Sequence, residues 1–169
     1  MPHRRQTLGT AGETAVAAWY RARGYEVEVP HHPGLNVEPI GTFLPGVLAA
    51  HTFDEHTVLV GHSGGAALLL ALLERVRVDR AFLVAGYCTR PNESEEPVLQ
   101  ETYDWEAIRA HAGELYFINP INDPYGCDDR QGRAMFERLG GTQIVRDDGH
   151  FGDHGQAYDE FPLLDRLIS

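Results

Sequence analysis

The sequence predicts a three-layer α/β sandwich, in which helices cover both faces of a mostly parallel sheet. Short apolar segments of strand length alternate along the chain with segments of helical pattern, and that alternation is typical of parallel sheets. The length of 169 residues fits one domain, and a content of 43% hydrophobic and 23% charged residues is that of a globular protein. No linker or internal repeat divides the chain, so we expect a single domain over residues 1–169.

The first expected elements are a helix, a strand and a second helix. Residues 10–13 match a capping box, so a helix should follow them and stop at Gly24, which suits a helix C-terminus. Residues 25–29 alternate apolar and acidic side chains, as a strand with one buried face does. A short helix is expected over residues 42–50, after a proline-rich loop.

Four apolar runs further along the chain are the other expected strands. Each has the length and composition of a buried parallel strand, and they cover residues 57–60, 81–85, 115–119 and 142–145. Residues 66–75 are apolar on nearly all sides through Leu73, which predicts a buried helix. Further helices are expected over residues 104–111, 130–139 and 161–168.

The charge of the chain limits its partners. A formal net charge of -11 argues against nucleic acid or an anionic membrane surface, since both repel an acidic protein. No apolar run is long enough to cross a bilayer, and residues 1–10 lack the apolar core of a signal peptide. We therefore expect a cytoplasmic protein. Its two cysteines, Cys88 and Cys127, do not suggest a disulfide framework.

A G-x-S-x-G motif lies between an expected strand and an expected buried helix. Residues 61–65 read Gly-His-Ser-Gly-Gly, and a strand–turn–helix of this kind lifts the serine hydroxyl clear of the sheet. Small neighbours are needed because backbones crowd at that turn. Ser63 is therefore a candidate nucleophile. The structural alternative is a glycine-rich turn that happens to contain a serine.

A serine nucleophile needs a base, and the base needs an acid that orients it. Asp123 follows one expected strand and His150 follows the next, in the Ser–Asp–His order of α/β-hydrolases. The carboxyl ends of parallel strands lie at one edge of a sheet, so both side chains should lie near Ser63. Asp128 and Asp129 compete for the role of the acid. The structural alternative is that Asp123 and His150 are ordinary loop residues without a catalytic role.

A metal site is a competing interpretation of the histidine region. Carboxylates and imidazoles are suitable ligands, and this region contains Asp147, Asp148, His150, Asp153 and His154. The H-x-x-x-H pair lacks the glutamate of a zincin helix, and no second cluster with ligand spacing accompanies it. We therefore expect no metal and no other cofactor.

With these motifs together, the chain resembles the retinoblastoma-binding protein 9 / YdeN-like serine hydrolases from about Tyr20 onward. Besides the G-x-S-x-G motif, the resemblance depends on Tyr103-Asp104-Trp105-Glu106-Ala107-Ile108, Asn122-Asp123-Pro124, Gly149-His150-Phe151, Gly155 and Phe161-Pro162. It implies a compact α/β-hydrolase without a large cap domain. It also implies that Ser63, Asp123 and His150 form the catalytic triad and that the substrates are small esters or amides.

The resemblance further implies a first strand, followed by a loop that helps to build the oxyanion hole. Residues 6–8 are too few and too polar to be that strand, which is missing from the sequence pattern. Three explanations are open: the strands at 25–29 and 57–60 pair directly, residues near Gln6 form a short strand, or the chain starts too late by about fifteen residues. We favour the last explanation, because the chain begins almost where the oxyanion loop should be.

The expected chemistry is acyl transfer through Ser63, with the backbone N–H of Gly64 as one oxyanion donor and the second donor unassigned. We expect an open cleft for a small ester or amide substrate, bordered by Tyr87, Tyr103, Trp105 and Phe151. Trp105 equally suits an anchor of its helix in the core. The alternative function is a non-catalytic binding module, derived from a hydrolase fold with a defective oxyanion loop.

Overall fold

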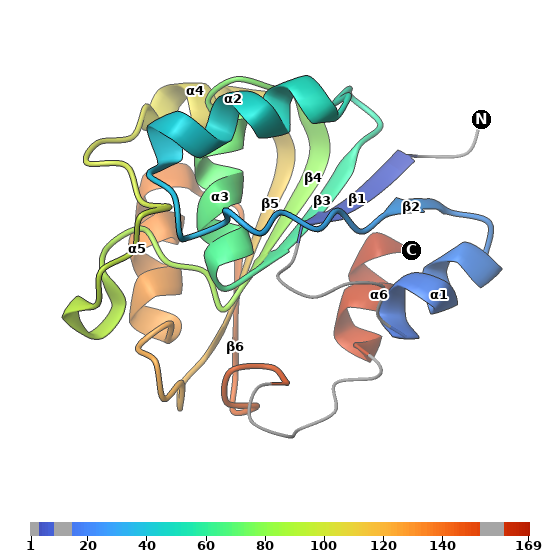
Figure 1. The fold of residues 1–169 in the computed structure, drawn as a ribbon. Coiled ribbons are helices and arrows are strands. Elements are labelled where there is room, and N and C mark those ends of the chain that lie inside the picture. The colour runs from blue at the N-terminus through green and yellow to red at the C-terminus, as the bar shows by residue number, and fades with distance from the viewer. Residues whose placement is uncertain (1–3, 9–14, 153–160) are drawn as a thin grey trace.

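Six parallel strands form one continuous sheet at the centre of the protein (Figure 1). The computed structural model describes residues 4–8, 15–152 and 161–169. The strands are β1 Arg4–Leu8, β2 Glu26–Glu28, β3 Val58–His62, β4 Val78–Val84, β5 Ala112–Pro120 and β6 Thr142–Arg146. Their order across the sheet is β2-β1-β3-β4-β5-β6, and each neighbouring pair is parallel.

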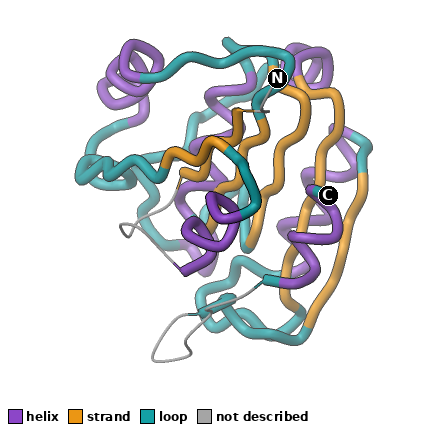
Figure 2. The backbone as a smooth tube through the Cα atoms, turned by 90° about the vertical axis from the view of Figure 1, so that its right-hand side faces the viewer, coloured by secondary structure: helices purple, strands orange, loops and turns teal. Residues whose placement is uncertain are grey.

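Helices cover both faces of the sheet, which confirms the three-layer α/β fold class. They are α1 Ala15–Ala22, α2 Ile40–Ala50, α3 Gly64–Leu73, α4 Trp105–His111, α5 Asp129–Leu139 and α6 Pro162–Ile168, with a 3-10 turn, η1, at Pro91–Glu93. Figure 1 shows α1 and α6 on one face and the other α-helices on the opposite face, and Figure 2 shows these layers from the side. In the residues that the structure describes, no helix is long and apolar enough to cross a membrane.

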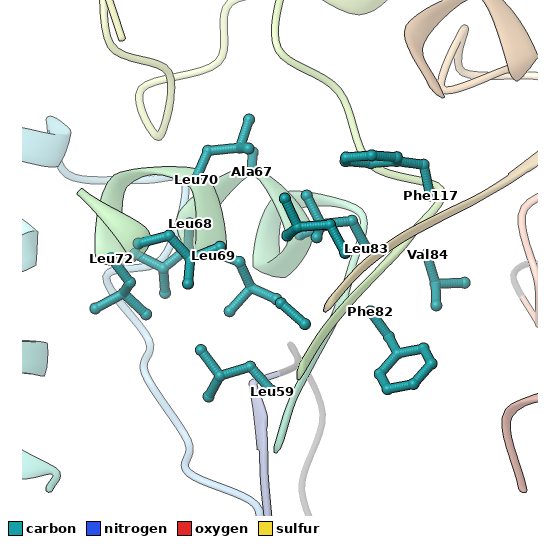
Figure 3. Packing of buried hydrophobic residues seen from close by; sticks show 14 of the residues in the cluster. Leu59, Ala67, Leu68, Leu69, Leu70, Leu72, Phe82, Leu83, Val84 and Phe117 are labelled. Atoms are coloured by element: carbon teal, nitrogen blue, oxygen red, sulfur yellow. The ribbon is translucent and has the colours of Figure 1, made fainter. Parts of the chain in front are cut away.

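The core centres on α3, the helix that follows the serine. Every residue from Gly64 to Leu73 is buried, which confirms the prediction of a helix that is apolar on nearly all sides. Figure 3 shows its leucine side chains in one cluster with Leu59, Leu83 and Phe117 from the neighbouring strands. Because close-packed interiors allow little movement, the start of this helix is a rigid platform for Ser63.

The first strand of the sheet, missing from the sequence pattern, is present as β1. Arg5 pairs with Val27 of β2 and with Val58 of β3, so β1 lies between its two expected neighbours. The prediction of a missing strand is therefore wrong, as is direct pairing of the neighbours, and the short strand near Gln6 is observed. Hydrogen bonds to parallel strands on both sides satisfy the backbone of β1. Because its stability comes from this pairing, β1 forms without the run of apolar side chains by which the other strands are recognised. The hypothesis of a late start loses the observation that motivated it, and the capping box at residues 10–13 lies outside the described residues.

The other predicted elements are confirmed, with shifts of a few residues at their ends. The strands β4 and β5 begin at Val78 and Ala112, rather than at positions 81 and 115. Val78 pairs with Ala112 and Arg80 pairs with Glu114, so tertiary pairing extends both strands into more polar sequence. The Arg80 guanidinium also donates to the last two backbone carbonyls before Ser169, at 3.0 Å each, and this fixes the end of α6 against the sheet.

Candidate active site

Ser63 occupies a sharp turn between β3 and α3, at the position that the G-x-S-x-G motif predicts. Its backbone has φ 56° and ψ -118°, and residues other than glycine rarely adopt a positive φ. The Ser63 N–H donates to the carbonyl of Val84 at 2.9 Å, which ties the turn to the end of β4. Strained backbone of this kind persists only where the surrounding structure holds it, and it is concentrated at functional sites.

Steric crowding explains why the first residue of the motif, residue 61, is a glycine. A Cβ atom at Gly61 would lie 2.6 Å from the carbonyl oxygen of Gly65 and 2.7 Å from the nitrogen of Ala66, closer than real contacts allow. Gly61 therefore lets β3 pass against the first turn of α3. Gly64 begins that helix directly after Ser63, where its N–H is expected to act as an oxyanion donor. The loop after β1, which is expected to supply the second donor, lies outside the described residues.

His150 and Asp123 are in direct contact. His150 Nδ1 lies 2.7 Å from Asp123 Oδ2, and the side chains are 8% and 0% exposed respectively. The other carboxylate oxygen of Asp123 accepts a hydrogen bond from the N–H of Tyr125 at 2.8 Å. When Nδ1–H donates to Asp123, His150 keeps Nε2 as an acceptor, which is the tautomer that a general base requires. Ser63 and His150 line the same cavity.

Asp128 and Asp129, the two alternatives to Asp123 as the acid, belong to the start of α5. Asp128 is the N-cap of α5: one of its oxygens accepts from the N–H of Arg130 at 3.0 Å, and the other lies 2.7 Å from the Arg130 guanidinium. Asp129 is the first residue of α5. The carboxylate that contacts His150 is that of Asp123, as the sequence order predicts.

Two further residues position the loops that contain Asp123 and His150. Asn122 donates to the carbonyl of Asp147 and accepts from the N–H of Gly149, both at 3.0 Å, which joins the loop after β5 to the loop after β6. His62 donates from Nε2 to the carbonyl of His150 at 2.7 Å, and the two rings lie 4.8 Å apart. The sequence motifs contain both residues, but nothing in the motifs reveals these contacts.

Asn119, at the end of β5, anchors the loop that contains Asp123, hereafter the acid loop. Its side chain is fully buried and donates from Nδ2 to the carbonyls of Gly86 and Cys127, at 3.0 Å each. The helix α5 approaches so closely that a Cβ at Gly132 would lie 2.4 Å from Asn119 Oδ1. The sequence shows only a polar residue at the end of a strand, so this role could not be predicted from it.

A cavity of about 410 Å³ lies beside Ser63 and His150. Its walls come from three loops: the segment after β4 with Tyr87, Pro91, Asn92, Ser94 and Glu96, the acid loop with Pro124, Tyr125 and Cys127, and Asn36 before α2. Cavities of this size suit small ligands. Among these described residues, the wall contains one carboxylate, that of Glu96, and no arginine.

Glu96 joins the wall residues in a hydrogen-bond network. Its Oε2 accepts from the Tyr87 hydroxyl at 2.6 Å and from the Asn36 amide, and its Oε1 accepts from the Ser94 hydroxyl at 2.8 Å. Burial raises the pKa of Tyr87, and the hydrogen bond to Glu96 raises it further, so the phenol remains a donor. Sequence analysis identified Tyr87 but did not identify Asn36, Ser94 or Glu96.

Three aromatic residues expected at the cleft lie elsewhere, which corrects the sequence-based prediction. Tyr103, Trp105 and Phe151 are not among the residues that line this cavity. The rings of Tyr103 and Trp105 lie 5.1 Å apart, and the Arg138 guanidinium lies 5.5 Å from the Trp105 ring. Phe151 is 6% exposed and packs near Phe161. Because Trp105 begins α4, which packs against α5, its large ring anchors that helix instead of facing the serine.

The metal site considered in the histidine region is only partly described. The carboxylate of Asp148 is 2.7 Å from Arg146 Nε, and this ion pair uses one of the proposed ligand oxygens. His150 faces Asp123, while Asp153 and His154 lie outside the described residues.

The serine on a strained turn after β3 and the histidine–aspartate pair after later strands are arranged as in the α/β-hydrolase fold. The chain is 23% identical over 152 residues to serine hydrolase RBBP9 of Rattus norvegicus, covering 83% of this chain and 81% of that protein. No family model matches the chain. These findings, with the structural similarities below, confirm the resemblance to the RBBP9/YdeN-like hydrolases.

Solved structures share the fold over nearly the whole chain. The ydeN gene product from B. subtilis has a TM-score of 0.83 at 18% identity, covering 98% of this chain and 96% of that chain. The esterase domain of a Rhodothermus marinus protein has a TM-score of 0.69 at 14% identity, covering 99% and 87%. The chain thus shares its fold with these proteins and is similar to the RBBP9/YdeN-like hydrolases.

Proposed function

We propose that the protein is a serine hydrolase that cleaves ester or amide bonds of small substrates through Ser63, Asp123 and His150. The observation that carries the proposal is the 2.7 Å contact between His150 Nδ1 and Asp123 Oδ2. His150 lines the same cavity as Ser63, which lies on its strained turn. A base held in the correct tautomer at the same cavity as a serine is the arrangement that activates a serine hydroxyl.

The proposed reaction proceeds through an acyl-enzyme. Ser63 Oγ attacks the substrate carbonyl while its proton passes to His150 Nε2, and Asp123 stabilises the resulting imidazolium. The Gly64 N–H donates to the oxygen that becomes negative in the tetrahedral intermediate. Collapse of the intermediate transfers the proton to the leaving alcohol or amine. Water then attacks the acyl-enzyme by the same route and releases the acid.

The partners and compartment follow from the composition and the cavity. A cavity of about 410 Å³ supports a small-molecule substrate, and the net charge of -11 argues against nucleic acid and membrane surfaces as partners. We infer a cytoplasmic enzyme, because Cys88 and Cys127 are both free thiols, as is usual in a reducing compartment. The chemistry requires no cofactor.

The test uses the small number of serines in the chain, which are Ser63, Ser94 and Ser169. A fluorophosphonate should label one serine, and mass spectrometry of the peptides should locate the label at Ser63. A panel of aryl esters with short acyl chains should be hydrolysed by the wild-type protein and by the Ser169→Ala control, but not by Ser63→Ala. A folded wild-type protein that neither reacts with the probe nor hydrolyses any ester would overturn the proposal and favour the non-catalytic binding module.

A further inference from the structure

Cys127 lies in the cavity next to all three proposed catalytic residues, although the reaction gives it no role. It is 2% exposed, and it lines the same cavity as Ser63 and His150. The sulfur, a carboxylate oxygen of Asp123 and a ring nitrogen of His150 all lie within 4.8 Å of one another. A thiol, an imidazole and a carboxylate therefore converge at one point in the described part of the chain.

This donor set is one that zinc prefers. Zn²⁺ binds thiolate sulfur at about 2.3 Å and imidazole nitrogen or carboxylate oxygen at about 2.0–2.2 Å, in tetrahedral geometry. Ligand atoms around such an ion are about 3.3–3.7 Å apart. Atoms that already lie within 4.8 Å need side-chain movements of about one ångström to reach that geometry. The Ser63 hydroxyl or water is available for the fourth position.

The carboxylates near Cys127 favour binding of a dication. Asp123 belongs to the same cluster, Glu96 lines the same cavity, and Asp128 is the next residue in the chain. The same negative charges attract a divalent cation. On binding, the thiol proton passes to solvent and the sulfur takes the metal in its place. Among the residues that line the cavity, no arginine opposes the added positive charge.

We propose that Cys127, His150 and Asp123 form an inhibitory zinc site within the catalytic centre. The regulatory role rests on the proposed function, whereas metal binding itself does not. A zinc ion held between Asp123 and His150 takes Nδ1, the nitrogen that faces Asp123. The proton of the neutral imidazole then lies on Nε2, which can no longer accept the serine proton, so hydrolysis stops while the metal is bound. Removal of the metal by a chelator frees the base and restores activity. The site thus makes the hydrolase sensitive to free zinc.

Binding is tested without reference to activity, with Co²⁺ as a spectroscopic substitute for Zn²⁺. A cobalt–thiolate bond gives a charge-transfer absorption in the near ultraviolet, and titration with Zn²⁺ should remove it. The band should appear with the wild-type protein and with Cys88→Ser, in which Cys127 is the remaining thiol. It should be absent from Cys127→Ser and Cys127→Ala. The Cys88→Ser result needs no change at the site, so the test survives if both Cys127 variants fail to fold.

Inhibition is then measured as the zinc concentration that halves the ester hydrolysis rate, relative to the zinc-free rate of each variant. Loss of the thiolate should raise that concentration by at least about 10- to 100-fold. His51→Gln is the matched control, because His32 and His51 place two Nε2 atoms 3.1 Å apart and are another possible site for zinc. This control should remain as sensitive as the wild-type protein.

The outcomes separate the two proposals. A Cys127-dependent cobalt band in a protein without esterase activity would keep the metal site and reject the hydrolase. Absence of the band from folded wild-type protein, or equal zinc sensitivity in Cys127→Ser, would overturn the metal site and leave the hydrolase unaffected. Zinc sensitivity lost in His51→Gln would place the inhibitory metal at the other histidine pair and also overturn the proposal.

Discussion

The serine turn and the cavity wall opposite it are built in different ways. The turn is made by contiguous residues, and its shape follows from a local steric rule: a Cβ at Gly61 would meet the backbone of Gly65 at 2.6 Å. The wall is assembled from Asn36, Tyr87 and Glu96, which are distant in sequence and joined by hydrogen bonds to one carboxylate. A feature with its own short sequence motif can therefore be predicted from the sequence, whereas contacts between distant side chains that belong to no motif cannot.

The largest expected effect tests whether Asp123, which its sequence motif predicts, is the acid that orients His150. Asp123→Asn should lower kcat on the order of 10⁴-fold, because an amide at this position stabilises the wrong tautomer of the base. Asp128→Asn is the matched control and should leave kcat nearly unchanged, since asparagine also caps helices well. Steady-state hydrolysis of an aryl ester measures both. An equal loss in the control would mean that Asp123 has been wrongly assigned as the acid.

The next effect tests the steric rule at the turn. Gly61→Ala should reduce the free energy of unfolding by about 3 kcal/mol, because the added methyl group meets backbone atoms that cannot move aside. The control is Gly46→Ala, at an exposed position in α2 where a Cβ meets nothing within 4 Å. That change should stabilise the protein by roughly 0.5–1 kcal/mol. Urea unfolding of both variants gives the comparison, and similar effects would refute the steric explanation.

The same contrast explains what sequence reasoning could and could not predict. The order of elements, the fold class and the contact between Asp123 and His150 follow from patterns that each occupy one short segment, and the catalytic role of Ser63, Asp123 and His150 stays a prediction. The strand β1 was overlooked because its evidence is pairing with β2 and β3, not apolar side chains. Trp105 was expected at the cavity because aromatic character alone does not reveal which neighbour a ring packs against.

A smaller effect tests whether the assembled wall stabilises the fold. Tyr87→Phe should reduce the free energy of unfolding by about 1–2 kcal/mol, since it removes a buried hydrogen bond to the carboxylate of Glu96. Tyr116→Phe is the control, because its hydroxyl makes the same kind of contact with Glu114 at the exposed surface. Contacts of charged groups with solvent nearby contribute little, so the control should change stability by at most about 0.5 kcal/mol. Equal losses would show that the network adds nothing beyond an ordinary surface contact.

The smallest effect concerns the loop that carries Asn36 to the wall. At the start of this loop, His32 Nε2 lies 3.1 Å from His51 Nε2, and His51 Nδ1 lies 3.1 Å from Glu28 Oε2. When His51 donates to Glu28 from Nδ1, its Nε2 accepts from His32 Nε2. Burial lowers the pKa of His32 below the ordinary value of 6.5, and the neighbouring His51 and His31 lower it further.

A lowered histidine pKa fixes the sign of the pH dependence. Below about pH 6.5 the unfolded chain binds a proton at this residue more readily than the folded protein does, so stability is lost on acidification. The contribution is fully present above the ordinary histidine pKa and disappears as the pH falls through the lowered value. His32→Gln keeps a hydrogen-bonding side chain but cannot titrate, so its unfolding free energy should fall less between about pH 7.5 and 5.5 than that of the wild-type protein. A difference between the two proteins that is constant over this range would mean that His32 does not couple the loop to pH, and that Asn36 is held by its contacts with Glu96 and Val98 alone.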